Sequence, residues 1–323
     1  MILTSEQIDR ASGVLLGQAI GDALGVPYEF AAPVAAGQAR MVGGGLGPYE
    51  PGEYSDDTQM AVCIARIGVT GTDLSSESGI DAVARAFVEW YRDGASDVGI
   101  GTRAALSSTP RPGETPGRQL ARAAEEYHIS HGMGAGNGAL MRTAIVALGS
   151  LDDRDRTARA AAAIAGLTHA DRLAAESSVL LTEAVRIAVV EGRLDLRAGL
   201  DLLIEPSRQE WSDWIDAAEH EVPGTFTPNG YTVTTMQAAW SAIIATGGGS
   251  VGPDGPGARI EAGLQRAVAI GDDTDTVGAV VGALLGARWG ASALPAAWVD
   301  AVHGWPGLRA ADLVDLAQRT AGV

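Results

Sequence analysis

Cysteine is almost absent from this sequence, since Cys63 is the only one among 323 residues. A single cysteine excludes an internal disulfide and favours a reducing compartment, which we take to be the cytoplasm. The neighbours of Cys63 are apolar and follow a helical pattern. We therefore expect a buried structural thiol.

Basic and aromatic residues are scarce as well. Lys and Arg together number 23 against 40 Asp and Glu, the formal net charge is −17, and aromatic residues make up 5% of the chain. So acidic a surface repels phosphate backbones, which argues against a nucleic-acid scaffold as partner. An anionic small ligand would need metal ions or the positive ends of helices to overcome this field.

Long uncharged apolar runs are missing too. No window reaches the roughly 18 residues that a membrane span needs, and Asp22 interrupts the first apolar stretch. The N-terminus carries no basic region before that stretch. The sequence therefore predicts neither a membrane partner nor a signal peptide.

Period-2 alternation is also absent, whereas helical periodicity recurs along almost the whole chain. Ser5 is expected to cap the first helix, and Gly25 with Pro27 to end it. The predicted helices cover 5–24, 57–68, 79–92, 116–127, 138–148, 155–166, 172–191, 197–203, 208–218, 232–246, 258–269, 274–288 and 310–320. Segment 247–257 is predicted to be a mobile surface insertion. We predict an all-α fold, with residues 1–323 forming one compact single-domain orthogonal helical bundle.

Two acidic segments stand at the starts of apolar helices. They are Ser55-Asp56-Asp57-Thr58 and Asp273-Thr274-Asp275-Thr276, the second preceded by Asp272. Each alone could be an ordinary cap, because carboxylates complement the N–H groups and the dipole of a helix start. Three acids before a buried helix exceed what one cap needs, and few basic residues lie nearby to compensate them. All-oxygen ligands without Cys or His favour Mg²⁺, Mn²⁺ or Ca²⁺ over zinc, and two segments could serve two ions.

Glycines mark two further features. Gly278, Gly282 and Gly286 recur at every fourth position, a smooth stripe against which another helix can pack closely. Segment 132–138 precedes the helix predicted from Gly138, so it is either a pyrophosphate cradle or a flexible connection between helices. Asp22, in an otherwise apolar turn, is interpreted as a buried polar brace rather than a partner of the metal ligands.

Taken together, these motifs resemble the ADP-ribosylglycohydrolase family. The family includes the bacterial hydrolase that removes ADP-ribose from dinitrogenase reductase and the vertebrate ADP-ribosyl-acceptor hydrolases. The resemblance runs from about Ile8 to Gly290. The matching segments are Gly21–Gly25, Ser55–Thr58, Gly136–Gly138 with Met141 and Arg142, Thr168 with His169, Gly230 with Tyr231, and Asp273–Ala279.

The resemblance implies a bundle around a binuclear metal site that holds two Mg²⁺ or Mn²⁺ ions. The implied metal ligands are Ser55, Asp56, Asp57, Asp273, Asp275 and Thr276. The implied ADP-ribose contacts are Gly134, Ala135, Gly136, Asn137 and Gly138 at the diphosphate, Tyr231 at the ribose or adenine, and His169 near the ligand. For His169 a buried structural role is an equal alternative. Glu29 matches a family glutamate on a flap that closes over the metals.

Three positions depart from the family pattern. Asp272 stands where many members have Gly, and Ala135 where some vertebrate relatives carry an aromatic that stacks on adenine. Thr234 stands where Asp is frequent. These departures bear on acceptor specificity more than on the metal site.

We therefore expect a metal-dependent hydrolase that cleaves the bond between ADP-ribose and an acceptor, most simply protein arginine. Asp56, Asp57 and Glu29 are the expected catalytic residues, with Asp56 or Asp57 accepting a proton from the attacking water. The expected partner is ADP-ribose or an ADP-ribosylated protein. Serine, nucleotide-base and O-acetyl linkages remain open, as does a non-catalytic ADP-ribose-binding module. A phosphohydrolase and a purely structural protein are weaker alternatives.

Overall fold

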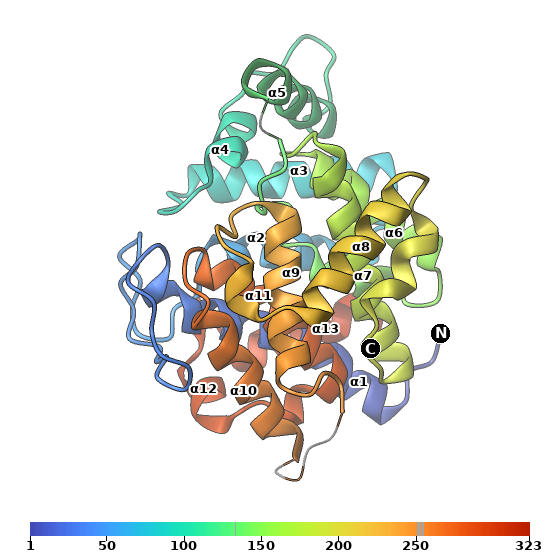
Figure 1. Ribbon diagram of the computed structural model, residues 1–323. Coiled ribbons are helices and arrows are strands. Elements are labelled where there is room, and N and C mark those ends of the chain that lie inside the picture. Colours follow the sequence, from blue (N-terminus) through green and yellow to red (C-terminus); the bar gives the residue numbers. More distant parts are fainter. Residues whose placement is uncertain (133, 251–252, 254) are drawn as a thin grey trace.

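Figure 1 shows the computed structural model of the chain, which describes residues 1–132, 134–250, 253 and 255–323. Nearly all regular structure in this part of the chain is helical, so the predicted all-α class is confirmed. The exceptions are the strands β1 (His303–Gly304) and β2 (Leu308–Arg309), which pair antiparallel. Strands of two residues are too short to show an alternating pattern in the sequence.

Most helices follow one another with short connections, and the longest connection, residues 29–55, leads from η1 to α2. The α-helices are α1 (Ser5–Gly25), α2 (Asp56–Gly68), α3 (Glu77–Arg92), α4 (Ile100–Leu106), α5 (Pro116–His131), α6 (Arg154–Gly166), α7 (Arg172–Glu191), α8 (Ser207–His220), α9 (Thr232–Ala245), α10 (Gly255–Val268), α11 (Thr274–Trp289), α12 (Ala296–Ala301) and α13 (Ala310–Thr320). The 3₁₀ helices are η1 (Val26–Tyr28), η2 (Ala144–Ser150), η3 (Leu196–Leu202), η4 (Pro223–Thr225) and η5 (Ala291–Ala293).

Several predicted elements are corrected. The α-helix predicted over 138–148 is wrong, because residues 137–143 form turns and only the 3₁₀ helix η2 follows them. The segment predicted as a helix over 197–203 is the 3₁₀ helix η3. The short helices α4 and α12 were not predicted, since neither is long enough to show a helical period.

The N-cap of the first helix lies one residue before the predicted one. Thr4, not Ser5, is the N-cap, and its hydroxyl accepts a hydrogen bond from the Gln7 amide. The Gln7 side chain in turn accepts from the Thr4 amide, which completes a capping box. Cys63 is buried, as predicted.

The glycine stripe of α11 packs against a matching stripe on α1. Gly13, Gly17 and Gly21 of α1 face Gly286, Gly282 and Gly278 of α11, and a Cβ on any of them would collide with the facing backbone. Because both helices lack side chains along this seam, their backbones touch. The seam ends with Gly25 against Asp275 and with a hydrogen bond of 2.8 Å from Thr274 Oγ1 to the Gly25 carbonyl. Close packing thus brings the end of α1 to the first turn of α11.

The remaining helices surround this pair. In Figure 1, α11 lies in the middle of the body and α1 is labelled at its lower right, α10 and α12 lie at its lower left, and α3, α4 and α5 form its upper part. α13, α2 and α7 pack on α1, while α9 and α10 pack on α11. None of the helices in the described ranges combines the length and apolar character that crossing a bilayer requires. Of the segment predicted to be a mobile insertion, Val251, Gly252 and Asp254 lie outside the described residues.

Candidate functional site

The two acidic segments lie together at the starts of α2 and α11. The Ser55 hydroxyl is 3.3 Å from Asp57 Oδ2 and 3.4 Å from Asp275 Oδ2. Glu29, just beyond α1, joins them: its carboxylate and those of Asp273 and Asp275 offer oxygens that all lie within 4.8 Å of one another. We call Glu29, Asp56, Asp57, Asp273 and Asp275 the acidic cluster. The packing of α1 on α11 is what brings its three chain segments to one point.

Asp22 of α1 holds the start of α2 in place. Its Oδ1 accepts hydrogen bonds from the Ser55 amide at 2.9 Å and the Ser55 hydroxyl at 2.8 Å. Its Oδ2 accepts from the Thr58 amide at 3.0 Å and the Thr58 hydroxyl at 2.6 Å. Asp22 therefore caps α2 from another helix, while the N-cap residue Ser55 makes no such bond with its own helix. Burial raises the pKa of Asp22 to about 6, although these four bonds oppose the shift.

The acidic cluster is electrostatically unfavourable without a counter-charge. Burial, and then the neighbouring carboxylates, raise the pKa values of Asp56, Asp57 and Asp275 well above their usual range. Burial first and Asp273 second raise the pKa of Glu29 to about 8. Asp57 Oδ1 is buried with no hydrogen-bond partner. A divalent cation bound by these oxygens would neutralise the repulsion among the carboxylates and would coordinate the unpaired Asp57 Oδ1. These residues therefore fit a magnesium- or manganese-type site.

Two asparagines fix the position of Asp273. The Asn137 side chain donates to Asp273 Oδ2 at 2.9 Å, and Asn229 Oδ1 accepts from the Asp273 amide at 2.9 Å. Asn137 was predicted as a contact of the diphosphate, but its side chain is engaged with the acidic cluster. Asn229 was not predicted. The signal that could have found it is an amide residue directly before Gly230 and Tyr231.

A cavity of about 540 Å³ opens above the acidic cluster, within the usual size range of small-molecule sites. Asp56, Asp57, Glu29, Asp273, Asp275 and Thr276 line its floor. Gly134, Gly136, Asn137, Gly138, Thr168 and His169 line one wall, and Val98, Ile100, Gly101, Thr102, Ala124 and Tyr127 line the wall formed by α4 and α5. The cavity therefore joins an acidic floor to a glycine-rich wall and a largely apolar wall.

The glycine-rich loop is held by the segment that leads into α9. The Asn137 amide donates to the Gly230 carbonyl at 3.2 Å, and the Thr232 amide donates to the Ala135 carbonyl at 2.9 Å. Gly136 also forms an antiparallel bridge with Tyr231. Since turns follow Gly138, the helix dipole that was expected to face a phosphate here is absent. Met133 lies outside the described residues.

His169 is both buried and part of the cavity wall. Its Nδ1 lies 2.8 Å from the Thr168 hydroxyl, which accepts a hydrogen bond of 2.7 Å from the buried Arg142. Burial, followed by the charge of Arg142, lowers the pKa of His169 to about 3, so the ring is neutral. Its other nitrogen, Nε2, lies beside Gly136 and Gly138. The two interpretations left open by the sequence are therefore compatible.

Three residues lie differently from the expectation. Asp97, in the glycine-rich segment before α4, was not predicted, yet it lines the cavity, and burial followed by Asp273 raises its pKa. Among the described residues that line the cavity, neither Ala135 nor Tyr231 is present, and the Tyr231 side chain is 41% exposed. Their backbones take part in the contacts that hold the glycine-rich loop, Ala135 through its carbonyl and Tyr231 through its bridge with Gly136.

Comparison with known proteins points to one family. The profile of the family described as ADP-ribosylglycohydrolase matches residues 3–323. An ADP-ribosylarginine hydrolase of Pseudomonas putida is 31% identical over 310 residues, which cover 93% of this chain and 76% of that protein. A glycohydrolase of ADP-ribosyl dinitrogen reductase from Rhodospirillum rubrum is 28% identical over 299 residues, 90% of each chain.

The similarity extends to a solved structure. A chain titled ADP-ribosylglycohydrolase-related protein complex aligns with a TM-score of 0.73 and 29% sequence identity. The alignment covers 99% of both chains. The whole described architecture, and not only the site, is therefore shared with that protein.

Proposed function

The chain belongs to the ADP-ribosylglycohydrolase family, and on that premise we propose that it is a metal-dependent hydrolase that releases ADP-ribose from an acceptor, most simply a protein arginine side chain. The observation that carries the proposal is the acidic cluster at the floor of the cavity. Ordinary helix capping does not require five carboxylates from three chain segments in one buried place. Two relatives named as ADP-ribosylarginine hydrolases support arginine as the acceptor.

We assign two Mg²⁺ or Mn²⁺ ions to the acidic cluster. The proposed ligands are Ser55, Asp56, Asp57, Asp273, Asp275 and Thr276, with Glu29 closing the site. All of them offer oxygen, and the unpaired Asp57 Oδ1 and the mutually raised pKa values fit a site built for cations. Such ions, when bound, supply Lewis-acid polarisation and make an adjacent water more acidic.

The chain's own residues supply the proton transfers. Asp56 or Asp57 accepts a proton from the water that attacks the anomeric carbon of the distal ribose. The carbon–nitrogen bond to the acceptor breaks, its electron pair leaves with the guanidine, and the proton taken from the water passes to that guanidine, which departs as a guanidinium. We assign to Asp97, the half-buried carboxylate near α4, the attraction of this cationic leaving group. A carboxylate beside the departing group favours a guanidinium over a neutral acceptor.

The rest of ADP-ribose would lie along the two walls. Gly134, Gly136 and Gly138 allow the diphosphate to approach the backbone closely. His169 adds a neutral ring there, so the diphosphate meets no additional negative charge. Ala135 offers no aromatic ring, and the apolar wall with Ile100 and Tyr127 is the part of the cavity suited to the base.

The test is release of ADP-ribose from ADP-ribosylated arginine with Mg²⁺ or Mn²⁺, with EDTA, and in Asp275→Asn. We expect hydrolysis that requires the metal and that falls at least about 100-fold in the variant. Asp315→Asn, which changes an exposed acid of α13 in the same way, is the control with unchanged rates. Full activity in EDTA and in Asp275→Asn would refute the metal role.

The nature of the product separates the alternatives. ADP-ribose released from serine, nucleotide-base or O-acetyl substrates, but not from arginine, would change the acceptor and keep the chemistry. AMP would indicate a phosphohydrolase acting on the diphosphate. Tight binding of ADP-ribose without turnover of any linkage would indicate a binding module.

A further inference from the structure

Two residues next to the acidic cluster adopt an unusual backbone conformation. Phe30 and Asp272, at φ 48° and 58°, are the non-glycine residues with positive φ in the described part of the chain. This left-handed region is unfavourable for a bulky residue such as Phe and better tolerated by Asp. The two residues are also bonded to each other, because the Phe30 amide donates to the Asp272 carbonyl at 2.7 Å.

On the Phe30 side, the unusual conformation belongs to a tight turn that carries Glu29. The Ala31 amide donates to the Tyr28 carbonyl at 3.1 Å, and Glu29 has φ −58° and ψ 121°. With a positive φ at Phe30, this is the geometry of a type II β-turn, whose third position ordinarily needs Gly or Asn. The direction of the Glu29 side chain therefore depends on Phe30 remaining in a conformation that it disfavours.

On the Asp272 side, a clamp formed by the buried Asn229 side chain holds the backbone on both sides of Asp272. The Asn229 side chain donates to the Gly271 carbonyl at 3.1 Å and accepts from the Asp273 amide at 2.9 Å. The Asp272 carbonyl points away from this clamp and accepts from both Phe30 and Thr274, the latter at 3.0 Å. The clamped turn thus presents a fixed acceptor to the turn that carries Glu29.

Repulsion among the carboxylates of the acidic cluster explains why the hydrogen bond between Phe30 and Asp272 is needed. Oxygens of Glu29, Asp273 and Asp275 that could share an ion lie within 4.8 Å of one another. When ionised, these carboxylates repel one another unless a cation or a proton lies between them. Glu29 comes from a loop, whereas the other two lie at the start of a buried helix. Without the hydrogen bond between Phe30 and Asp272, the loop that carries Glu29 would move away from Asp273 and Asp275.

We propose that Phe30 and Asp272 are positioning residues, whose backbone hydrogen bond holds the Glu29 carboxylate against Asp273 and Asp275 and thereby sets how tightly the acidic cluster binds a divalent cation. The inference rests on the metal site of the proposed function. It assigns the role of Asp272 to its backbone conformation and not to its carboxylate.

The test compares substitutions by their tolerance of positive φ. Phe30→Gly and Asp272→Gly keep the amide, the carbonyl and the turn, so we expect Mn²⁺ affinity within about twofold of the unmodified protein. Phe30→Pro removes the donor, and Asp272→Val disfavours the conformation, so we expect affinity to fall about tenfold or more in each. Calorimetric titration with Mn²⁺ measures this, and far-UV circular dichroism with thermal unfolding confirms that each variant folds.

A second readout requires no metal and no turnover. In metal-free protein, amide hydrogen exchange of residues 28–33 should be as slow in the two Gly variants as in the unmodified chain and at least about tenfold faster in Phe30→Pro and Asp272→Val. If the exchange rates are equal in all five proteins, the hydrogen bond between Phe30 and Asp272 does not hold this loop, and the proposal is wrong whether or not the protein is an enzyme. Asp272→Gly losing as much Mn²⁺ affinity as Asp272→Val would overturn it as well, because the carboxylate would then be the active group. If the variants rank as expected in Mn²⁺ affinity and exchange rate but the unmodified protein hydrolyses no substrate, the proposed function is refuted. The positioning role of Phe30 and Asp272 then still holds.

Discussion

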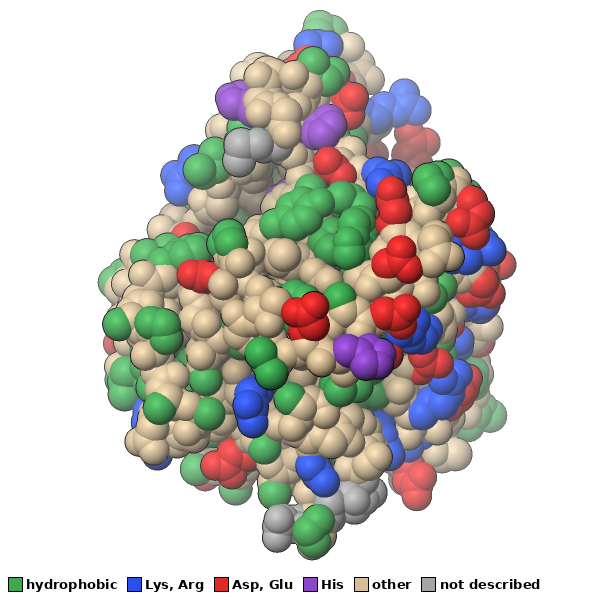
Figure 2. Space-filling view, in the orientation of Figure 1, with side chains coloured by type: hydrophobic (Ala, Val, Ile, Leu, Met, Phe, Trp, Pro, Cys, Tyr) green, Lys and Arg blue, Asp and Glu red, His purple; other side chains and the backbone are tan. Residues whose placement is uncertain are grey.

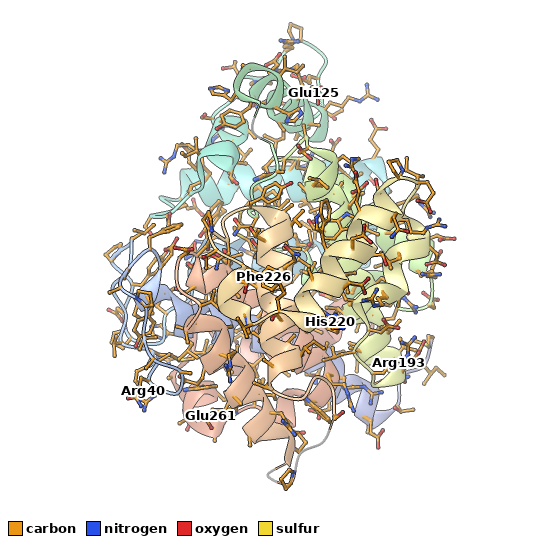
Figure 3. The ribbon with its side chains drawn as sticks, viewed as in Figure 1. Arg40, Glu125, Arg193, His220, Phe226 and Glu261 are labelled. Carbon is orange, nitrogen blue, oxygen red and sulfur yellow. The ribbon has the colours of Figure 1, made fainter. Side chains whose placement is uncertain are left out.

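Acidic residues in this protein occupy two contrasting environments. On the surface many of them are paired with arginine, the chain having no lysine. Figure 2 shows red and blue side chains next to one another around α6 and α8, and Figure 3 labels Arg193 on the same side. Arg193 contacts both Glu191 and Asp195 at 2.6 Å. In the acidic cluster, by contrast, carboxylates face other carboxylates.

The difference appears in the direction of the pKa shifts. The pKa of Glu114, bonded to Arg122 at 2.7 Å, falls to about 2, mainly through that hydrogen bond. The pKa of Glu29 rises to about 8, mainly through burial. Exposed pairs are screened by water and contribute little each. Like charges that no cation neutralises disfavour the folded state, and a group of strongly shifted carboxyls in a cavity is typical of functional sites. The same residue type thus meets arginine partners in one place and like charges in the other.

The largest expected effect is the removal of one cluster charge. Asp57→Asn should reduce hydrolysis by about 1,000-fold or more, because it removes both a ligand and a candidate base. It should also raise the free energy of unfolding of the metal-free protein, because a repelled buried carboxylate is gone. Steady-state rates and denaturant unfolding in EDTA measure the two effects. An activity loss accompanied by lower metal-free stability would contradict the electrostatic account.

Divalent ions should stabilise the protein by binding the native state alone. At a concentration of Mg²⁺ or Mn²⁺ 100 times the dissociation constant, one site adds about 2.7 kcal/mol to the free energy of unfolding. Thermal unfolding with and without EDTA measures the change, and Asp275→Asn should abolish it. Sodium chloride at equal ionic strength is the control, because it screens the surface pairs and cannot replace the ligand. Equal stabilisation by both salts would contradict a specific site.

The pH dependence should have opposite signs in the two environments. The pKa of Glu29 rises on folding from 4.5 to about 8, so between these values the folded state binds the extra proton. In metal-free protein the free energy of unfolding should therefore fall as pH rises from 4.5 to 8, and Glu29→Gln should flatten this slope. The pKa of Glu114 falls on folding, so its contribution is present above about pH 4.5 and is lost towards pH 2. Unfolding measured at several pH values in EDTA tests both signs.

The smallest expected effect is at the surface. Glu114→Gln removes the charge from a partly buried, bidentate pairing with Arg122, and it should leave hydrolysis within about twofold and lower the melting temperature by only about a few degrees. Paired measurements against Asp57→Asn under the same conditions provide the comparison. A loss of activity in Glu114→Gln similar to that of the cluster variant would remove the distinction between the two environments.

Prediction from sequence succeeded where local pattern and global fold agree. The long amphipathic helices and the glycine stripe of α11 have periods that one chain segment carries by itself. It failed after Gly138, where turns replace the predicted helix because the loop is bonded instead to residues 230–232. Asp97 and Asn229 were missed for a related reason, since single polar residues in loops show no period.

The sequence by itself determined that the fold is helical, that two acidic segments begin apolar helices, and that a hard cation suits them, because each of these depends on residue type and short spacing. Only the tertiary structure decided that the two segments meet, that Asp22 caps α2 from α1, and that Glu29 and Asp97 face the same cavity. Those facts depend on two glycine-lined helices touching along their backbones. Contact between distant segments depends on how surfaces fit together, which no local pattern encodes.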